Sequence, residues 1–110
     1  MAVVYKYPVK PGPEGYFELE LPRAALFMKV EEQHGVPQMW WLVAEPNVTR
    51  KRRFRIVGTG HDFDLQGFRP LGTFLGCDGA LVWHLFLEEK TEDAIADAFA
   101  SMFRERGGAG

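Results

Sequence analysis

The stretch LGTFLGCDGALVWHLFL, residues 71–87, decides the fold. Two apolar runs flank Asp78-Gly79, a dipeptide typical of the two-residue type I′ turn that joins the strands of a β-hairpin. In that register Phe74 faces Trp83 across the strand pair. The pattern therefore predicts an antiparallel hairpin at this point of the chain.

Two further expectations follow from the composition of this hairpin. Gly72 and Gly76 would lie diagonally on either side of Trp83, where the missing side chains leave room for the indole ring. Residues 80–87 are apolar on both faces apart from His84. We therefore expect a central strand that is covered on both sides.

A second hairpin is predicted upstream, where residues 26–33 and 36–44 flank His34-Gly35. A type I′ turn needs positive φ at both central positions, and histidine is among the residues that tolerate it. The register brings four side chains together on one sheet face, where we expect them in the core: Met28, Val30, Met39 and Trp41.

Three more strands are indicated by β-prone or alternating runs at residues 3–7, 16–21 and 52–59, the second of them ended by Pro22. Together with the four hairpin strands they predict a mainly β fold. We expect an antiparallel β-sandwich or small barrel of about seven strands, closed by one C-terminal α-helix.

The tail of the chain changes from a strand period to a helical one. Thr91 is a good N-cap, and a single apolar stripe follows it: Ile95, Phe99, Met102 and Phe103. The predicted organisation is a β domain over residues 1–88 and a helix over 89–106, packed on the same domain or on a second chain. Residues 107–110 read as a disordered end.

Length and composition place the chain among small soluble domains. It has 110 residues, of which 46% are hydrophobic, and no apolar run approaches the roughly 20 residues that span a bilayer. No signal peptide is visible, and Cys77 is the only cysteine, which is typical of a reducing compartment. We expect a location in the bacterial cytoplasm.

Charge is concentrated in one segment, which we call the basic strip: Arg50, Lys51, Arg52, Arg53 and Arg55. The whole chain nevertheless has a net charge of −2. Four interpretations remain open. The strip could contact nucleic-acid phosphates or a protein partner, or it could protect an edge strand by charge. It could also pair with acidic residues of the chain, namely Glu88, Glu89, Glu92, Asp93 and Asp97.

Other candidate site residues each have a structural alternative. His61 with Asp62 or Asp64 could bind a metal or act as a general base, whereas in the alternative they bond the loop backbone. Cys77 is more simply an inert thiol beside a turn than a nucleophile. Trp40 is expected on the face opposite Trp41, covered by another layer or exposed as an interface anchor.

Several short motifs occur in a fixed order, among them Val4–Pro8, Gly58–His61, Leu71–Phe74 and Gly79–His84. In these motifs the chain resembles a family of short phage and prophage proteins of uncharacterised function. The resemblance covers about residues 3–88. It implies a viral or prophage setting and brings no activity, cofactor or site residue with it.

Taken together, these patterns predict a non-catalytic binding module that acts through protein–protein contacts. It would inhibit a host factor or defence, or serve as a virion or assembly component. We expect no cofactor, no metal and no membrane partner, and the sequence leaves open a homodimer through the C-terminal helix or an edge strand. The expected contact residues are Arg50, Lys51, Arg53, Arg55, Trp40 and His61. One alternative is a nucleic-acid-binding accessory protein that uses residues 50–55, and another is a small metal-dependent enzyme that uses His61, Asp62 and Asp64.

Overall fold

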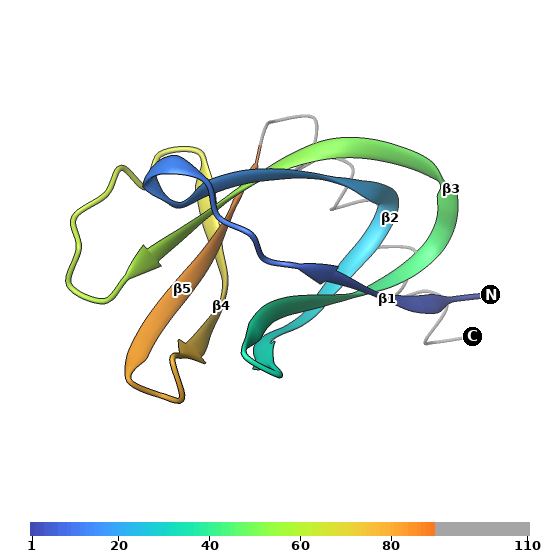
Figure 1. The fold of residues 1–110 in the computed structure, drawn as a ribbon. Coiled ribbons are helices and arrows are strands. Elements are labelled where there is room, and N and C mark those ends of the chain that lie inside the picture. Colours follow the sequence, from blue (N-terminus) through green and yellow to red (C-terminus); the bar gives the residue numbers. More distant parts are fainter. Residues whose placement is uncertain (90–110) are drawn as a thin grey trace, which may run out of the picture.

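The computed structural model describes residues 1–89, and these residues form one antiparallel sheet (Figure 1). The elements of this part of the chain are, in order, β1 Val3–Pro8, the 3₁₀ turn η1 Pro13–Gly15, β2 Tyr16–Gln33, β3 Val36–Gly58, β4 Phe68–Gly76 and β5 Leu81–Glu88. The mainly β, antiparallel class is confirmed. The predicted C-terminal helix and terminal tail lie outside the described residues, and within these no helix is long and apolar enough to cross a membrane.

Both predicted hairpins are present with the predicted turns. His34 and Gly35 have φ values of 52° and 80°, and Asp78 and Gly79 have 55° and 88°. The backbone N–H of Ala80 donates to the carbonyl of Cys77 over 3.1 Å, which closes the second turn. Positive φ at both central residues is the type I′ geometry, so local turn chemistry sets both hairpins.

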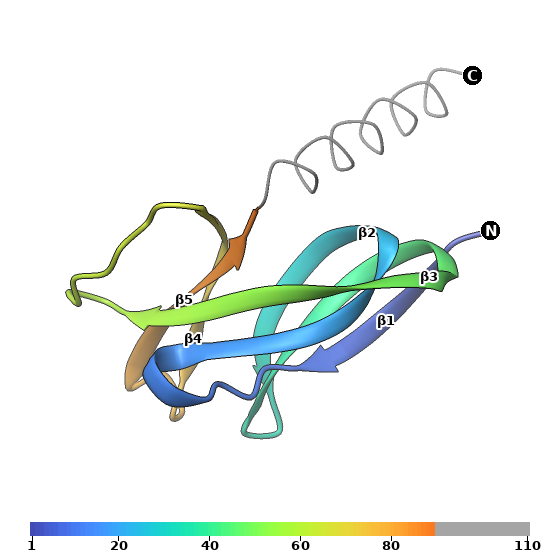
Figure 2. The same ribbon diagram turned by 90° about the horizontal axis from the view of Figure 1, so that it is seen from above.

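We expected seven strands, and the described chain has five. The difference arises because β2 joins the predicted strands 16–21 and 26–33, and β3 joins the predicted strands 36–44 and 52–59. Pro22 does not end a strand: it lies inside β2 and pairs with Thr49 of β3. Among the described strands β2 pairs only with β3, so its other edge is unpaired. A proline is tolerated in such a strand because its nitrogen, which has no N–H to donate, can face the unpaired edge. Register shifts beside Pro22 absorb the bend of the long β2–β3 ribbon, which Figure 2 shows from above.

A β-bulge overturns one of the four core predictions. Val30 pairs with Met39 as expected, but the register shifts between Phe27 and Lys29, so Phe27 rather than Met28 lies opposite Trp41. Met28 is 54% exposed in consequence. The bulge also brings the ring of Phe27 edge-on against Trp41, with the ring centroids 5.3 Å apart.

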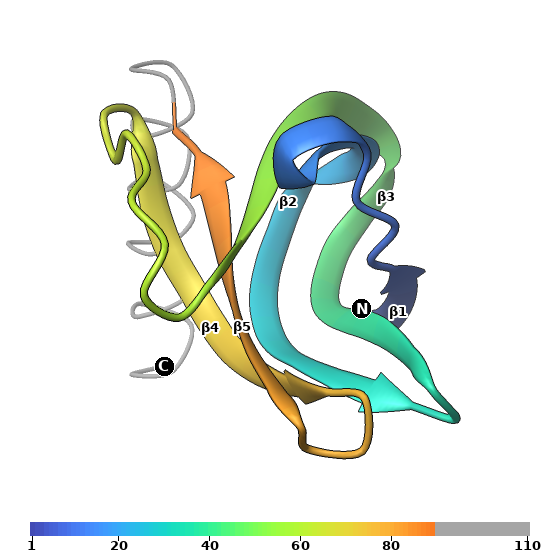
Figure 3. The same cartoon turned by 60° about the vertical axis from the view of Figure 1, so that its left-hand side comes forward.

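β3 is the organising strand of the sheet. β2 follows it along one edge, while the other edge pairs first with β1 and then with β5, and β4 lies beyond β5. The sheet coils so strongly that β4 packs against β2 (Figure 3). The described sheet is not closed into a barrel, however, because β4 pairs only with β5 among its strands. We call this line of contact between β2 and β4 the seam.

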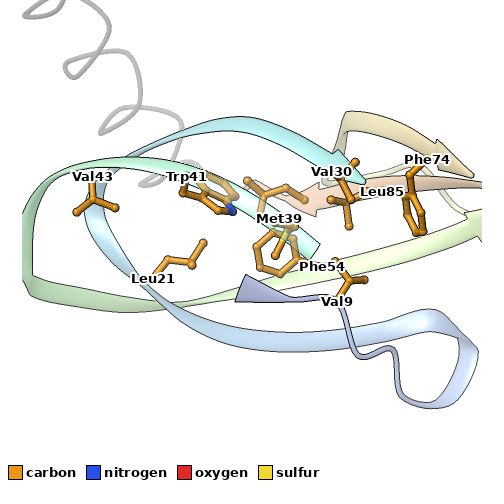
Figure 4. Close-up of a cluster of buried hydrophobic side chains, with 10 residues drawn as sticks. Val9, Leu21, Val30, Met39, Trp41, Val43, Phe54, Phe74 and Leu85 are labelled. Atoms are coloured by element: carbon orange, nitrogen blue, oxygen red, sulfur yellow. The ribbon is translucent and has the colours of Figure 1, made fainter. Parts of the chain in front are cut away.

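The core fills the inside of the coiled sheet (Figure 4). Trp41 lies edge-on to Phe54, and Phe17 stacks on Phe54 with ring centroids 5.0 Å apart. Seven side chains are completely or almost completely buried: Trp41, Phe54, Leu21, Met39, Leu85, Leu87 and Val43. They come from β2, β3 and β5, so the core depends on three strands at once.

The two glycines in β4 both allow close approach of a neighbouring side chain, but only one of them makes room for the indole ring. A Cβ on Gly76 would lie 3.0 Å from Nε1 of Trp83, as predicted. Gly72 instead faces β2 across the seam, where a Cβ would lie 3.2 Å from Cγ1 of Val30. β5 is an interior strand as expected, but Val82 is exposed, so its coverage on both sides is incomplete.

Candidate functional site

The basic strip lies in the second half of β3, and strand alternation divides it into two sets. Lys51, Arg53 and Arg55 point to one face, whereas Arg50 and Arg52 point to the other, where Arg52 is only 3% exposed. The strip is therefore not a single basic surface. Only its first set can meet a partner on the outer side of the sheet.

Acidic and aromatic neighbours surround this exposed set. The β2–β3 register places Glu18 opposite Arg53 and Glu20 opposite Lys51. Arg53 pairs with Glu88 of β5 at 3.3 Å, and Lys51 approaches Glu18 at 3.7 Å. The three cations of this face thus lie beside three carboxylates, those of Glu18, Glu20 and Glu88. The predicted pairing of the basic strip with Glu88 is confirmed.

Tyr16 holds the guanidinium groups of the strip in place. Arg53 and Arg55 lie over its ring, at 4.2 and 4.6 Å from the centroid. Arg55 also donates from Nε to the carbonyl oxygen of Glu14 over 3.3 Å. The aromatic ring and the turn before β2 therefore limit how far these side chains can reach toward an external anion.

His61 lies exposed in the loop after β3. Its backbone N–H donates to the carbonyl of Gly58 over 3.3 Å. Asp64 accepts a hydrogen bond from the backbone N–H of Gln66 at 3.0 Å, the loop role foreseen in the structural alternative. Within residues 1–89 no three His, Cys, Asp or Glu side chains gather as metal ligands would.

His84 has a bridging role that sequence reasoning missed. Its Nε2 lies 2.7 Å from Oγ1 of Thr59, and its Nδ1 lies 2.9 Å from Oγ1 of Thr73. One imidazole thus links the end of β3 with β5 and β4. The predicted hairpin register already places Thr73 opposite His84, so half of this bridge could have been found from the sequence.

Trp40 lies on the outer side of the sheet, half-buried, as the alternation with Trp41 requires. The ammonium group of Lys29 lies 6.0 Å from the centroid of its indole ring. Cys77, by contrast, is exposed in the β4–β5 turn with φ of 51°.

A groove of about 380 Å³ opens along the seam, between the tips of the two hairpins. Val30 of β2 and Phe74 of β4 are apolar side chains in its lining, and both are almost completely buried. Leu75, which is 56% exposed, extends this apolar lining on β4. The groove was not predicted because it exists only where β4 meets β2 without pairing.

The polar lining of the groove is acidic. Glu31, Glu32 and Asp78 line it, and no lysine or arginine of residues 1–89 does. Glu31 is paired with Lys29 at 2.8 Å, so Glu32 and Asp78 carry most of the negative charge. A Cβ on Gly76 would lie 3.4 Å from Oε2 of Glu32, which puts that carboxylate close to the β4 backbone.

Comparison with known proteins gives a family and no activity. No curated protein and no solved structure matches the chain. A family model described as a domain of unknown function, DUF7352, matches residues 1–96, which include β1 to β5 and the groove. The chain therefore belongs to the family of the domain of unknown function DUF7352.

Proposed function

We propose that the chain is a non-catalytic protein-binding module, and that the groove at the seam takes a basic, extended segment of its partner. The observation that carries the proposal is the combination of an apolar floor, an acidic lining and the edge of β4 in one place. An extended segment can add to an open sheet edge through its main chain, while alternate side chains enter pockets.

Charge decides between a protein and a nucleic-acid partner in this proposal. The exposed cations of the basic strip have carboxylates beside them, whereas Glu32 and Asp78 give the groove a negative lining. A phosphate backbone would be repelled by that lining, but lysine or arginine side chains would be attracted to it. The phage or prophage setting of the proposal is supported by the resemblance of the short motifs.

The test is selection of ligands from a random linear-peptide library on the full-length chain. We expect peptides enriched in lysine or arginine, next to residues with high strand propensity. Neutralising the groove with Glu32→Gln and Asp78→Asn should weaken their binding by roughly 2- to 30-fold, since each exposed charge pair contributes about 0.2–1 kcal/mol.

The matched control carries the same charge change away from the groove, in Glu45→Gln and Asp62→Asn. Both of these residues are exposed and neither lines the groove. The control should bind like the unmodified chain in low salt. If the two double variants lose affinity equally, or the selected peptides show no basic preference, the groove is not the contact site.

A further inference from the structure

One hydrogen bond reveals which way the main chain of β5 faces. The backbone N–H of Thr59 donates to the carbonyl of Val82 over 3.4 Å, so the main-chain groups of Val82 face the β3 side. In an antiparallel sheet the N–H and C=O groups of one residue point to the same neighbouring strand, and those of the next residue point to the other. The main-chain groups of Trp83 therefore face β4, where its partner is Phe74.

The same alternation decides which main-chain groups of β4 remain for a partner. Phe74 directs its N–H and C=O groups to Trp83, so those of Thr73 and Leu75 point the other way, toward the open edge of β4. Both residues are exposed, both line the groove, and no described strand pairs with them on that side. The groove thus contains the main-chain groups of two alternate residues, spaced as a neighbouring strand requires.

β2 also turns an edge toward the seam, but this edge is less accessible. The carbonyl of Pro37 accepts from the N–H of Val9 over 2.9 Å, so Pro37 faces β1. Its partner Glu32 therefore points its main chain away from β3, and so does Val30. Val30 is only 7% exposed and packs against Gly72 of β4. We therefore expect main-chain pairing at β4, whereas β2 contributes apolar contact and charge.

The edge of β4 is protected in its first half only. Open edges in natural sheets usually have charged residues, proline or bulges, which prevent pairing with other chains. In β4 these features are Arg69, Pro70 and a register shift before Gly72. Residues 72–76, Gly-Thr-Phe-Leu-Gly, contain neither charge nor proline. The half of the edge that lines the groove is therefore suited to accept an added strand.

We infer that the partner segment binds as a strand antiparallel to β4, hydrogen-bonded to the main chain of Thr73 and Leu75. The inference rests on the proposed function and adds a register to it. The residue opposite Gly76 is basic, because a Cβ on Gly76 would lie 3.4 Å from Oε2 of Glu32. The residue two places later is apolar, because it lies opposite the buried Phe74. Antiparallel pairing continues the pattern of the described sheet and is the more stable kind per residue.

The probe for this register is the peptide acetyl-Lys-Lys-Val-Val-Thr-amide. Its first lysine lies toward Asp78 and its second lies opposite Gly76. Its first valine pairs with Leu75, its second valine lies opposite Phe74, and its threonine pairs with Thr73. Binding to the isotope-labelled full-length chain is measured by NMR titration of the backbone amides. On saturation, hydrogen exchange of the Thr73 and Leu75 amides should slow about tenfold or more, whereas the Phe74 amide is protected in the free chain already.

Two singly N-methylated forms of the probe test the pairing. Methylation of the first valine removes the N–H that donates to the carbonyl of Leu75, and it should weaken binding about tenfold. Methylation of the second valine is the matched control, because that N–H points away from β4. It should change the affinity by less than about twofold.

A pair of protein variants tests the same bond from the side of the sheet. Leu75→Pro removes the N–H that faces the groove, whereas Leu75→Ala removes the side chain and retains the N–H. Proline is compatible with an edge strand whose nitrogen faces outward, so both variants should keep the amide spectrum of the intact sheet. We expect Leu75→Pro to bind the probe about tenfold more weakly than Leu75→Ala does.

The outcomes distinguish this inference from the proposed function. If both methylated peptides bind equally well, or methylation of the second valine is the more damaging, the segment does not pair with β4 and the inference is wrong. The proposed function still stands in that case if Glu32→Gln with Asp78→Asn weakens binding. If basic peptides selected from the library bind the groove but the probe does not, the register is wrong. If neither binds, the inference and the proposed function are both wrong.

Discussion

Two glycines with the same backbone conformation should respond very differently to alanine. Gly15 and Gly35 have φ values of 83° and 80°, so a side chain is strained at either position by about 1–2 kcal/mol. A Cβ on Gly35 would meet no atom within 4 Å. A Cβ on Gly15 would collide with the carbonyl oxygen of Ile56 in β3, a backbone atom that no side-chain rotation can move away.

Gly35→Ala should therefore lower the free energy of unfolding by about 1–2 kcal/mol, the strain alone. Gly15→Ala should add the cost of forcing η1 away from β3, about 1–3 kcal/mol more, which is the usual range for overpacking. Equilibrium unfolding in urea, followed by tryptophan fluorescence, measures both variants against the unmodified chain. Losses that agree within about 0.5 kcal/mol would refute the close approach of η1 to β3, because only the shared strain would then be at work.

Two further predictions concern the seam and β1. Gly72→Ala and Val30→Ala should be coupled by about 1 kcal/mol or more in a double-mutant cycle, because the new methyl group takes the space that the valine vacates; additive losses of stability would contradict the packing of β4 on β2. Burial, with a smaller contribution from Tyr5, raises the pKa of Tyr7 above its ordinary value of 10.0. The unfolded chain then ionises first, so the free energy of unfolding should fall as the pH rises through that window. Tyr7→Phe should reduce this fall in urea unfolding curves measured below and above pH 10, and an equal fall in both proteins would contradict a raised pKa of the half-buried Tyr7 phenol.

The hairpins could be predicted because their information is local. His34-Gly35 and Asp78-Gly79 determine the turns, and the turns determine the register next to them, including Phe74 opposite Trp83. The prediction became wrong several residues from the turn, at Met28. The bulge at this position depends on how Phe27 and Trp41 pack in the folded core, and the residues of the turn do not predict a bulge.

The two surfaces that we consider important for binding depend on contacts between distant segments. Glu18 lies beside the basic strip because β2 continues past Pro22 and pairs with β3 from Val36 to Arg55, whereas we expected the strand to end at the proline. The groove likewise requires that β4 reach β2 without pairing with it. Residue patterns within one segment contain no information about either arrangement, so the candidate site could be found only in three dimensions.

The continuity of β3 has a consequence for how the domain can change over time. One uninterrupted strand supplies the pairing edge for β1, β2 and β5, so each half of the sheet is completed by residues that also belong to the other. A cut in the middle of β3 would leave two fragments with bare edges and half a core each. Such a domain can be gained, lost or exchanged between genes only as a whole, while its hairpin tips remain free to vary in length.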